Sequence, residues 1–101
     1  MESLITQNAD EIVRLCRLFH VRQLELFGSA AQGQFQSDSD VDFLVEFEPL
    51  PEGSRADAYF GLLESLQALL KRSVDLVMLK AVRNRYFLEA IADSRTTLYA
   101  A

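Results

Sequence analysis

The chain has 101 residues, of which 15 are acidic and 10 basic, so its formal net charge at pH 7 is −5. Half of the residues are hydrophobic, which is too many for a disordered chain and enough for one core. We therefore expect a single domain over residues 1–101, without a separate substrate-binding domain. The acidic balance argues against a protein that binds nucleic acid through charge, because such binding needs clustered Lys and Arg.

Cysteine and histidine are each present once, as Cys16 and His20, which excludes an intrachain disulfide and a Cys/His metal site. Cys16 falls in an apolar pattern of helical spacing, so we expect it to be packed in the core. Residues 1–10 lack the apolar run of a signal peptide, and no segment approaches the roughly 20 apolar residues of a membrane span. These features predict a cytoplasmic protein without membrane contact.

Three elements are predicted in the first half of the chain. Apolar side chains recur at helical spacing over residues 3–19, which predicts an amphipathic helix. Residues 24–27 form a short apolar strand that ends at Gly28. Residues 41–47 alternate between apolar and largely acidic side chains, and this period of two is the clearest strand signal in the sequence.

The second half begins with a predicted loop over residues 48–57, which contains both prolines. Leucines at helical spacing predict a second amphipathic helix over residues 59–70. Residues 74–79 are apolar except for Asp75 and predict a third strand.

Two further elements complete the chain. Phe87, Ala90 and Ile91 share one face of a last predicted helix, and residues 97–100 are predicted to form a short edge strand. Helices thus interleave with strands along the sequence. This order favours one small β-sheet with helices packed against it.

Charge is unevenly distributed between the middle of the chain and its last third. Residues 38–57 contain seven acids and one base, whereas residues 71–95 contain six bases and three acids. Both stretches are explained by solvated surfaces, and the charge pattern alone favours that explanation. The acidic stretch nevertheless contains the residues that carry the strongest functional signal.

Asp40 and Asp42 stand two residues apart on the predicted strand, so both carboxylates leave the same face of the sheet. Their β-carbons are then roughly 6.5–7 Å apart. Carboxylates at this separation can converge on one or two divalent cations, and hard oxygen ligands of this kind suit Mg²⁺. The alternative is that both residues lie on the exposed face of an edge strand.

Gly28 and Ser29 directly follow the first predicted strand. Glycine lets backbone amides approach a ligand closely, and serine adds a hydroxyl donor, so this turn is a candidate phosphate site. Asp75 offers a third carboxylate, as a metal ligand or general base, if its strand pairs beside the first two acids. Its alternative role is a salt bridge to Lys71 or Arg72.

Two other phosphate or metal motifs fail on their required residues. The acids of residues 38–42 have EF-hand spacing, but Phe43 and Pro49 stand where that loop needs Gly and Glu. Residues 28–33 have the glycine spacing of a P-loop, but Gln34 follows where Lys is required.

Gly28-Ser29, ten intervening residues, and then Asp40-Val41-Asp42 resemble the GS-x10-D-x-D signature of the DNA polymerase β-like nucleotidyltransferase superfamily. Within it, the chain is similar to the minimal nucleotidyltransferases. The resemblance implies an α+β fold, with a small mixed sheet of the polymerase β-like palm type and helices packed against it. It also implies that Gly28 and Ser29 bind a nucleoside triphosphate, and that Asp40, Asp42 and Asp75 are catalytic and bind Mg²⁺.

The same resemblance implies a function. Small members of the family are often antitoxins paired with a HEPN-type toxin, and several transfer AMP from ATP to a tyrosine of that toxin. We therefore expect a Mg²⁺-dependent protein adenylyltransferase that acts as the antitoxin of a HEPN/MNT-type module. Because the chain is short, its acceptor is expected to arrive as a partner protein.

Two alternatives stay open from the sequence. Many relatives carry a basic residue just before the second glycine of the turn, where this chain has Gln32. That departure keeps open an antitoxin that neutralises its partner by binding alone. The other alternative is a nucleotidyltransferase that modifies a small molecule such as an antibiotic, although such relatives usually have an extra domain to hold the acceptor.

Overall fold

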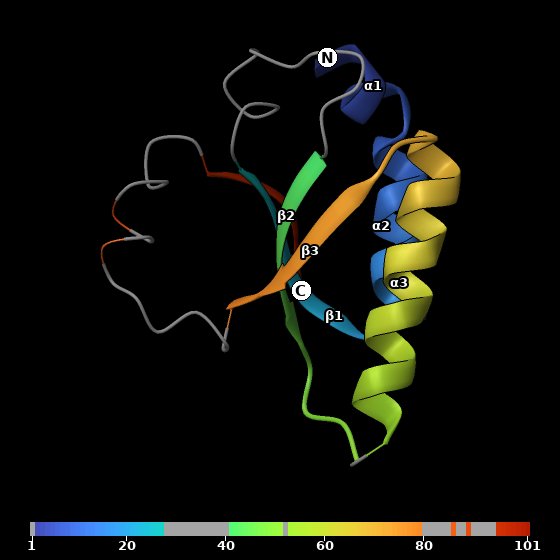
Figure 1. Ribbon diagram of the computed structural model, residues 1–101, viewed down its shortest axis with the longest axis vertical. Coiled ribbons are helices and arrows are strands. Elements are labelled where there is room, and N and C mark those ends of the chain that lie inside the picture. The colour runs from blue at the N-terminus through green and yellow to red at the C-terminus, as the bar shows by residue number, and fades with distance from the viewer. Residues whose placement is uncertain (1, 28–40, 52, 80–85, 87–88, 90–94) are drawn as a thin grey trace.

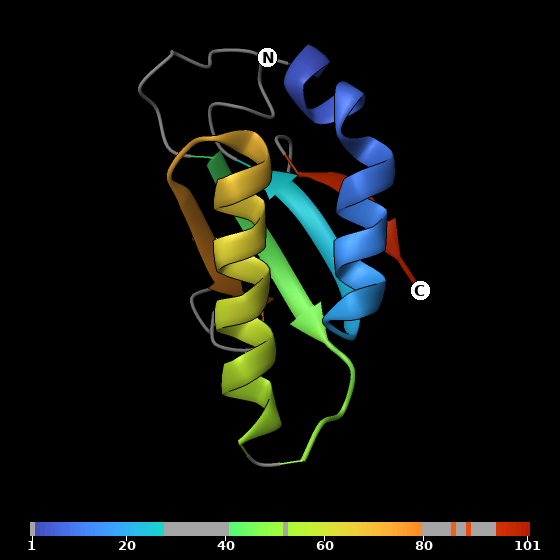
Figure 2. The ribbon, with the colours of Figure 1, turned by 90° about the vertical axis from the view of Figure 1, so that its right-hand side faces the viewer.

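The computed structural model describes residues 2–27, 41–51, 53–79, 86, 89 and 95–101 (Figure 1). Within these ranges, four strands form one sheet, and the two long helices lie side by side against one of its faces (Figure 2). The opposite face of the sheet points away from both helices (Figure 1). The expected sheet with helices packed against it is therefore confirmed.

The sheet is mixed, with its strands in the order β3-β2-β1-β4. Strand β1 (Val21–Phe27) runs antiparallel to both β2 (Val41–Phe47) and β4 (Thr96–Ala100), whereas β2 and β3 (Val74–Met78) are parallel. The predicted strand 41–47 matches β2, and the other predicted strands differ from the observed ones by one to three residues at an end. Phe87, Ala90 and Ile91, which define the last predicted helix, lie outside the described residues.

The predicted helix over residues 3–19 is wrong in one respect, because it is two helices, α1 (Glu2–Gln7) and α2 (Ala9–Leu18). They are separated by Asn8, which has φ −107° and ψ 10° and therefore leaves the helical conformation. The Asn8 N–H donates to the carbonyl of Ile5 at 3.2 Å, which is the tighter bond of a closing turn. Asparagine is favoured at such a boundary, and α2 starts directly after it.

The loop predicted over residues 48–57 also needs correction, because helix α3 (Ser54–Leu70) begins inside it. Gly53 has φ 88°, a conformation that glycine adopts without a steric penalty, and it turns the chain into the helix. At the other end, Lys71 has φ 57°, and its N–H donates to the carbonyl of Gln67 at 2.8 Å. This αL residue ends α3 and directs the chain toward β3.

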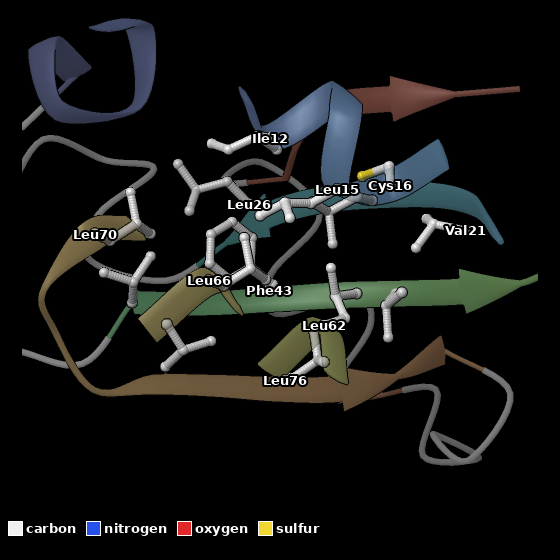
Figure 3. Close-up of a cluster of buried hydrophobic side chains, with 14 of the residues drawn as sticks. Ile12, Leu15, Cys16, Val21, Leu26, Phe43, Leu62, Leu66, Leu70 and Leu76 are labelled. Atoms are coloured by element: carbon white, nitrogen blue, oxygen red, sulfur yellow. The ribbon is translucent and has the colours of Figure 1, made fainter. Parts of the chain in front are cut away.

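The core lies between the helices and the sheet (Figure 3). Leu62 and Leu66 of α3 are fully buried there, as are Ile12 and Cys16 of α2 and Phe43 of β2. Burying one such leucine contributes about 1.5–3 kcal/mol, so this layer fixes the sheet against the helices. The expected core position of Cys16 is confirmed, and its burial raises the pKa of the thiol to about 12.

Among the described residues, no helix combines the length and the apolar character needed to cross a bilayer. A cytoplasmic location stays a prediction from the sequence.

Candidate active site

Asp42 and Asp75 face each other across the two parallel strands of the sheet. Asp42 lies in β2 and is half-buried, and Asp75 lies in β3 and is exposed. The two residues are direct partners in the β2–β3 register. The condition set by the sequence, that the Asp75 strand lies beside the Asp42 strand, is therefore met.

Both carboxylates project from the sheet face that the helices leave uncovered. Val41 and Phe43, the neighbours of Asp42, are part of the core beneath the helices, as are Val74 and Leu76, the neighbours of Asp75. Because side chains alternate along a strand, the two aspartates point to the other face. This placement explains how a carboxylate can interrupt the apolar pattern of 74–79 without entering the core.

The start of β3 is tied directly to the start of β2. The Val41 N–H donates to the carbonyl of Ser73 at 3.0 Å. Val41 precedes Asp42 by one residue, and Ser73 precedes Asp75 by two. Parallel strands that start level with each other bring their first side chains together at one end of the sheet. The two aspartates meet at that end for this reason.

Three of the predicted site residues, Gly28, Ser29 and Asp40, lie outside the described residues. Their neighbours in the sequence can be placed. Phe27, the last residue of β1, pairs in register with Asp42. Phe27, which precedes Gly28 in the sequence, therefore lies in the row that contains the two described carboxylates.

The oxygen donors of this row suit Mg²⁺, which favours carboxylate ligands and keeps part of its hydration shell. Within the residues that the structure describes, no group of three His, Cys, Asp or Glu side chains lies close enough to hold a metal ion. The remaining carboxylate predicted from the sequence, Asp40, precedes Val41 and lies outside that set. The described part of the site thus contributes a pair of carboxylates.

One acid on this face was not singled out from the sequence. Glu25 of β1 is only 3% exposed, and its carboxylate accepts hydrogen bonds from Arg95 Nε at 2.6 Å and Arg95 Nη2 at 2.8 Å. The Gln23 amide also donates to it. This pairing raises the pKa of the Arg95 guanidinium, chiefly through the hydrogen bond to Glu25.

A local signal for Glu25 existed in the sequence, because it interrupts the apolar run of 24–27 as Asp75 interrupts 74–79. Its partner lies 70 residues away, however, so no spacing pattern could identify the ion pair. Buried charges are retained when they are paired, and this pair is partly shielded from solvent.

A groove of about 630 Å³ lies at the opposite end of β3, between Met78 and the first turn of α3. Leu50, Arg55 and Tyr59 line it, and of the described site residues neither Asp42 nor Asp75 does. Tyr59 also ties this region together, because its hydroxyl donates to the Leu76 carbonyl at 2.6 Å. The groove is therefore separate from the carboxylate row.

The chain matches known proteins over most of its length. Residues 12–98 match the family described as nucleotidyltransferase domain. The chain is similar to protein adenylyltransferase MntA of Thermococcus cleftensis, with 39% identity over 84 residues that cover 83% of this chain and 79% of that protein.

Two solved structures have a similar fold. A putative minimal nucleotidyltransferase superposes with a TM-score of 0.76 at 28% identity, covering 91% of this chain and 90% of that one. A chain from the crystal structure of a toxin–antitoxin with AMP-PNP superposes with a TM-score of 0.72 at 25% identity, covering 93% of this chain and 74% of that one. The α+β fold with a mixed sheet, expected from the sequence resemblance, is confirmed.

Proposed function

Because the chain belongs to the nucleotidyltransferase domain family, we propose that it transfers AMP from ATP to a tyrosine hydroxyl of a partner protein. We further propose that this partner is a HEPN-type toxin and that the transfer, which requires Mg²⁺, makes the chain its antitoxin. The observation that carries the proposal is the register pairing of Asp42 with Asp75 on the sheet face that points away from the two helices. The similarity to an adenylyltransferase and to a chain from the structure of a toxin–antitoxin with AMP-PNP supports it.

In this proposal, Asp40, Asp42 and Asp75 hold Mg²⁺, and Gly28 and Ser29 contact the triphosphate. The bound ion would neutralise phosphate charge and stabilise the leaving oxygen. The protein's own contribution is to place three carboxylates at one end of a rigid sheet, so that little reorganisation is needed when substrates bind. The single domain that we propose over residues 1–101 contains all of these residues.

The proposed transfer forms a bond between the acceptor oxygen and the α-phosphorus of ATP. It breaks the bond from that phosphorus to the oxygen that bridges to the β-phosphate, so pyrophosphate leaves with the electron pair. The proton of the acceptor hydroxyl passes to the carboxylate of Asp75, which is exposed on an edge strand and accessible to an incoming partner. An acceptor presented by another protein fits this open position.

The test is transfer of label from α-labelled ATP to a HEPN-type protein encoded beside this chain, in the presence of Mg²⁺. We expect label on the partner, on a tyrosine identified by mass spectrometry, and its loss in Asp42→Asn and Asp75→Asn. Glu64→Gln is the matched control, because it removes one exposed negative charge from α3, on the far side of the sheet. Unlabelled partner in a stable complex would contradict transfer and would favour neutralisation by binding alone.

A further inference from the structure

Arg95 brings a positive charge to the same sheet face as the proposed catalytic carboxylates. Leu26 pairs with Thr96 in the β1–β4 register, so Arg95, one residue earlier, stands level with Phe27. Phe27 pairs with Asp42, and Asp42 pairs with Asp75. One cross-strand row therefore begins with two carboxylates and ends at Arg95.

The Arg95 side chain reaches from this row to Glu25, which lies two residues before Phe27 on β1. Glu25 and Phe27 lie on one face of β1, because the alternate residues Leu24 and Leu26 are in the core. Glu25 is a diagonal neighbour of Asp42, and such cross-strand neighbours are about 7–8 Å apart. Arg95 and Asp42 flank β1 on either side, so their backbones are about 9.5 Å apart, which is two strand spacings.

The Glu25–Arg95 pair fixes the position of the guanidinium but leaves some of its N–H donors available. Two hydrogen bonds, at 2.6 and 2.8 Å, use Nε and Nη2, and the Arg95 side chain keeps 29% of its surface exposed. A guanidinium has more N–H donors than these two bonds occupy. A planar cation whose rotamer is already fixed loses little entropy when it binds a phosphate oxygen.

A triphosphate at this site needs such a cation from outside the Gly-Ser stretch. Residues 28–40 contain no Lys or Arg, and residues 38, 40 and 42 are all aspartates. Neutralising a triphosphate beside these acids requires positive charge in addition to Mg²⁺. Arg95 supplies a positive charge on the correct face of the sheet, in a fixed position.

We propose that Arg95 binds the β- or γ-phosphate of the nucleotide, and that Glu25 is a positioning residue that orients its guanidinium. This inference rests on the proposed function and adds to it a phosphate-binding side chain. It assigns a role to an ion pair that would otherwise only join β1 to the start of β4.

The test compares nucleotide affinity in full-length variants by calorimetry, with a non-hydrolysable ATP analogue and Mg²⁺. Arg95→Gln alone leaves the buried Glu25 carboxylate unpaired and destabilises the fold, so the informative variant is Glu25→Gln/Arg95→Gln. If that chain does not fold, Glu25→Leu/Arg95→Met replaces the pair with apolar side chains. Arg22→Gln/Glu46→Gln is the charge-matched control, because it removes the Arg22–Glu46 ion pair near the other end of β1 and likewise leaves the net charge unchanged.

We expect the double variant to bind the ATP analogue about tenfold more weakly, while its affinity for AMP is unchanged. Glu25→Gln alone keeps the positive charge of Arg95 but no longer orients its guanidinium. The Kd of this variant for the ATP analogue should lie between those of the wild type and the double variant. Equal affinity for the ATP analogue in the wild type and the double variant, or a parallel loss of AMP binding, overturns the inference. A wild-type chain that binds no ATP analogue overturns the proposed function itself.

Discussion

Replacing Asp75 with asparagine should stabilise the metal-free protein and remove its response to Mg²⁺. Asp42 and Asp75 are direct cross-strand partners, and like charges in such positions destabilise a sheet by roughly 0.2–1 kcal/mol. Asp75 is exposed, so solvent screens the repulsion and keeps it within this range, at about 1 kcal/mol or less. Asp75→Asn removes that repulsion and keeps the shape of the side chain.

Added Mg²⁺ should favour the wild type over Asp75→Asn, which is the opposite of the order expected without metal. A ligand that binds only the folded state stabilises it by roughly 2.7 kcal/mol when its concentration is 100 times its Kd. The wild type should therefore gain stability on addition of Mg²⁺, whereas Asp75→Asn, with a weakened site, should gain much less. The stability order of the two chains in EDTA should reverse when Mg²⁺ saturates the wild type.

The assay is urea unfolding of both chains in EDTA and in excess Mg²⁺, with Glu64→Gln as control. Glu64 is exposed on α3, so its replacement should leave the Mg²⁺ response intact. Two results would refute the reasoning. One is an Asp75→Asn chain that is less stable than the wild type in EDTA, and the other is an equal gain in Mg²⁺ for both chains.

Three further substitutions or probes test the packing of the fold. Gly61→Ala should destabilise by up to about 2 kcal/mol in urea unfolding, because the new Cβ would lie 2.4 Å from the Phe19 ring and this overpacking exceeds the helix propensity gained; Phe19→Leu in the same chain should recover most of the loss. Tyr59→Phe should cost about 0.5–1.5 kcal/mol by the same measurement, since the Leu76 carbonyl loses its hydrogen bond. Cys16 should react with a thiol reagent near neutral pH only after unfolding, and rapid modification of the native chain would contradict its burial. Because the folded thiol holds its proton more tightly than the unfolded one, its contribution to stability is complete below the unfolded pKa and is lost as the pH rises toward about 12.

Periodicity predicted those elements in which one face is buried along the whole length. Strand β2 was predicted at its observed bounds, because Val41, Phe43, Val45 and Phe47 all enter the core. Helix α3 was predicted from Tyr59 onward, but it begins five residues earlier. Its first turn is exposed, and a solvent-facing turn leaves no apolar pattern to detect.

The candidate site could be predicted where its residues are close in the sequence or interrupt an apolar strand. Asp42 and Asp75 were identified in this way, and their pairing depended only on the order of two strands. Glu25 was overlooked because a single charge in a strand is usually assigned to the solvent-facing side. Its burial depends on Arg95, and that contact exists only after β4 has paired with β1.

The length of α3 is what brings the two described carboxylates into one row. Strand β2 has seven residues and advances about 23 Å, while α3 has 17 residues and returns about 25 Å in the opposite direction. The chain therefore re-enters the sheet level with the start of β2, where the Val41 N–H meets the Ser73 carbonyl. A parallel β3 that starts there places its second residue, Asp75, beside the second residue of β2, Asp42. The geometry of the proposed metal site thus follows from matched element lengths, and the leucines that bury α3 against the sheet stabilise the site although none of them touches it.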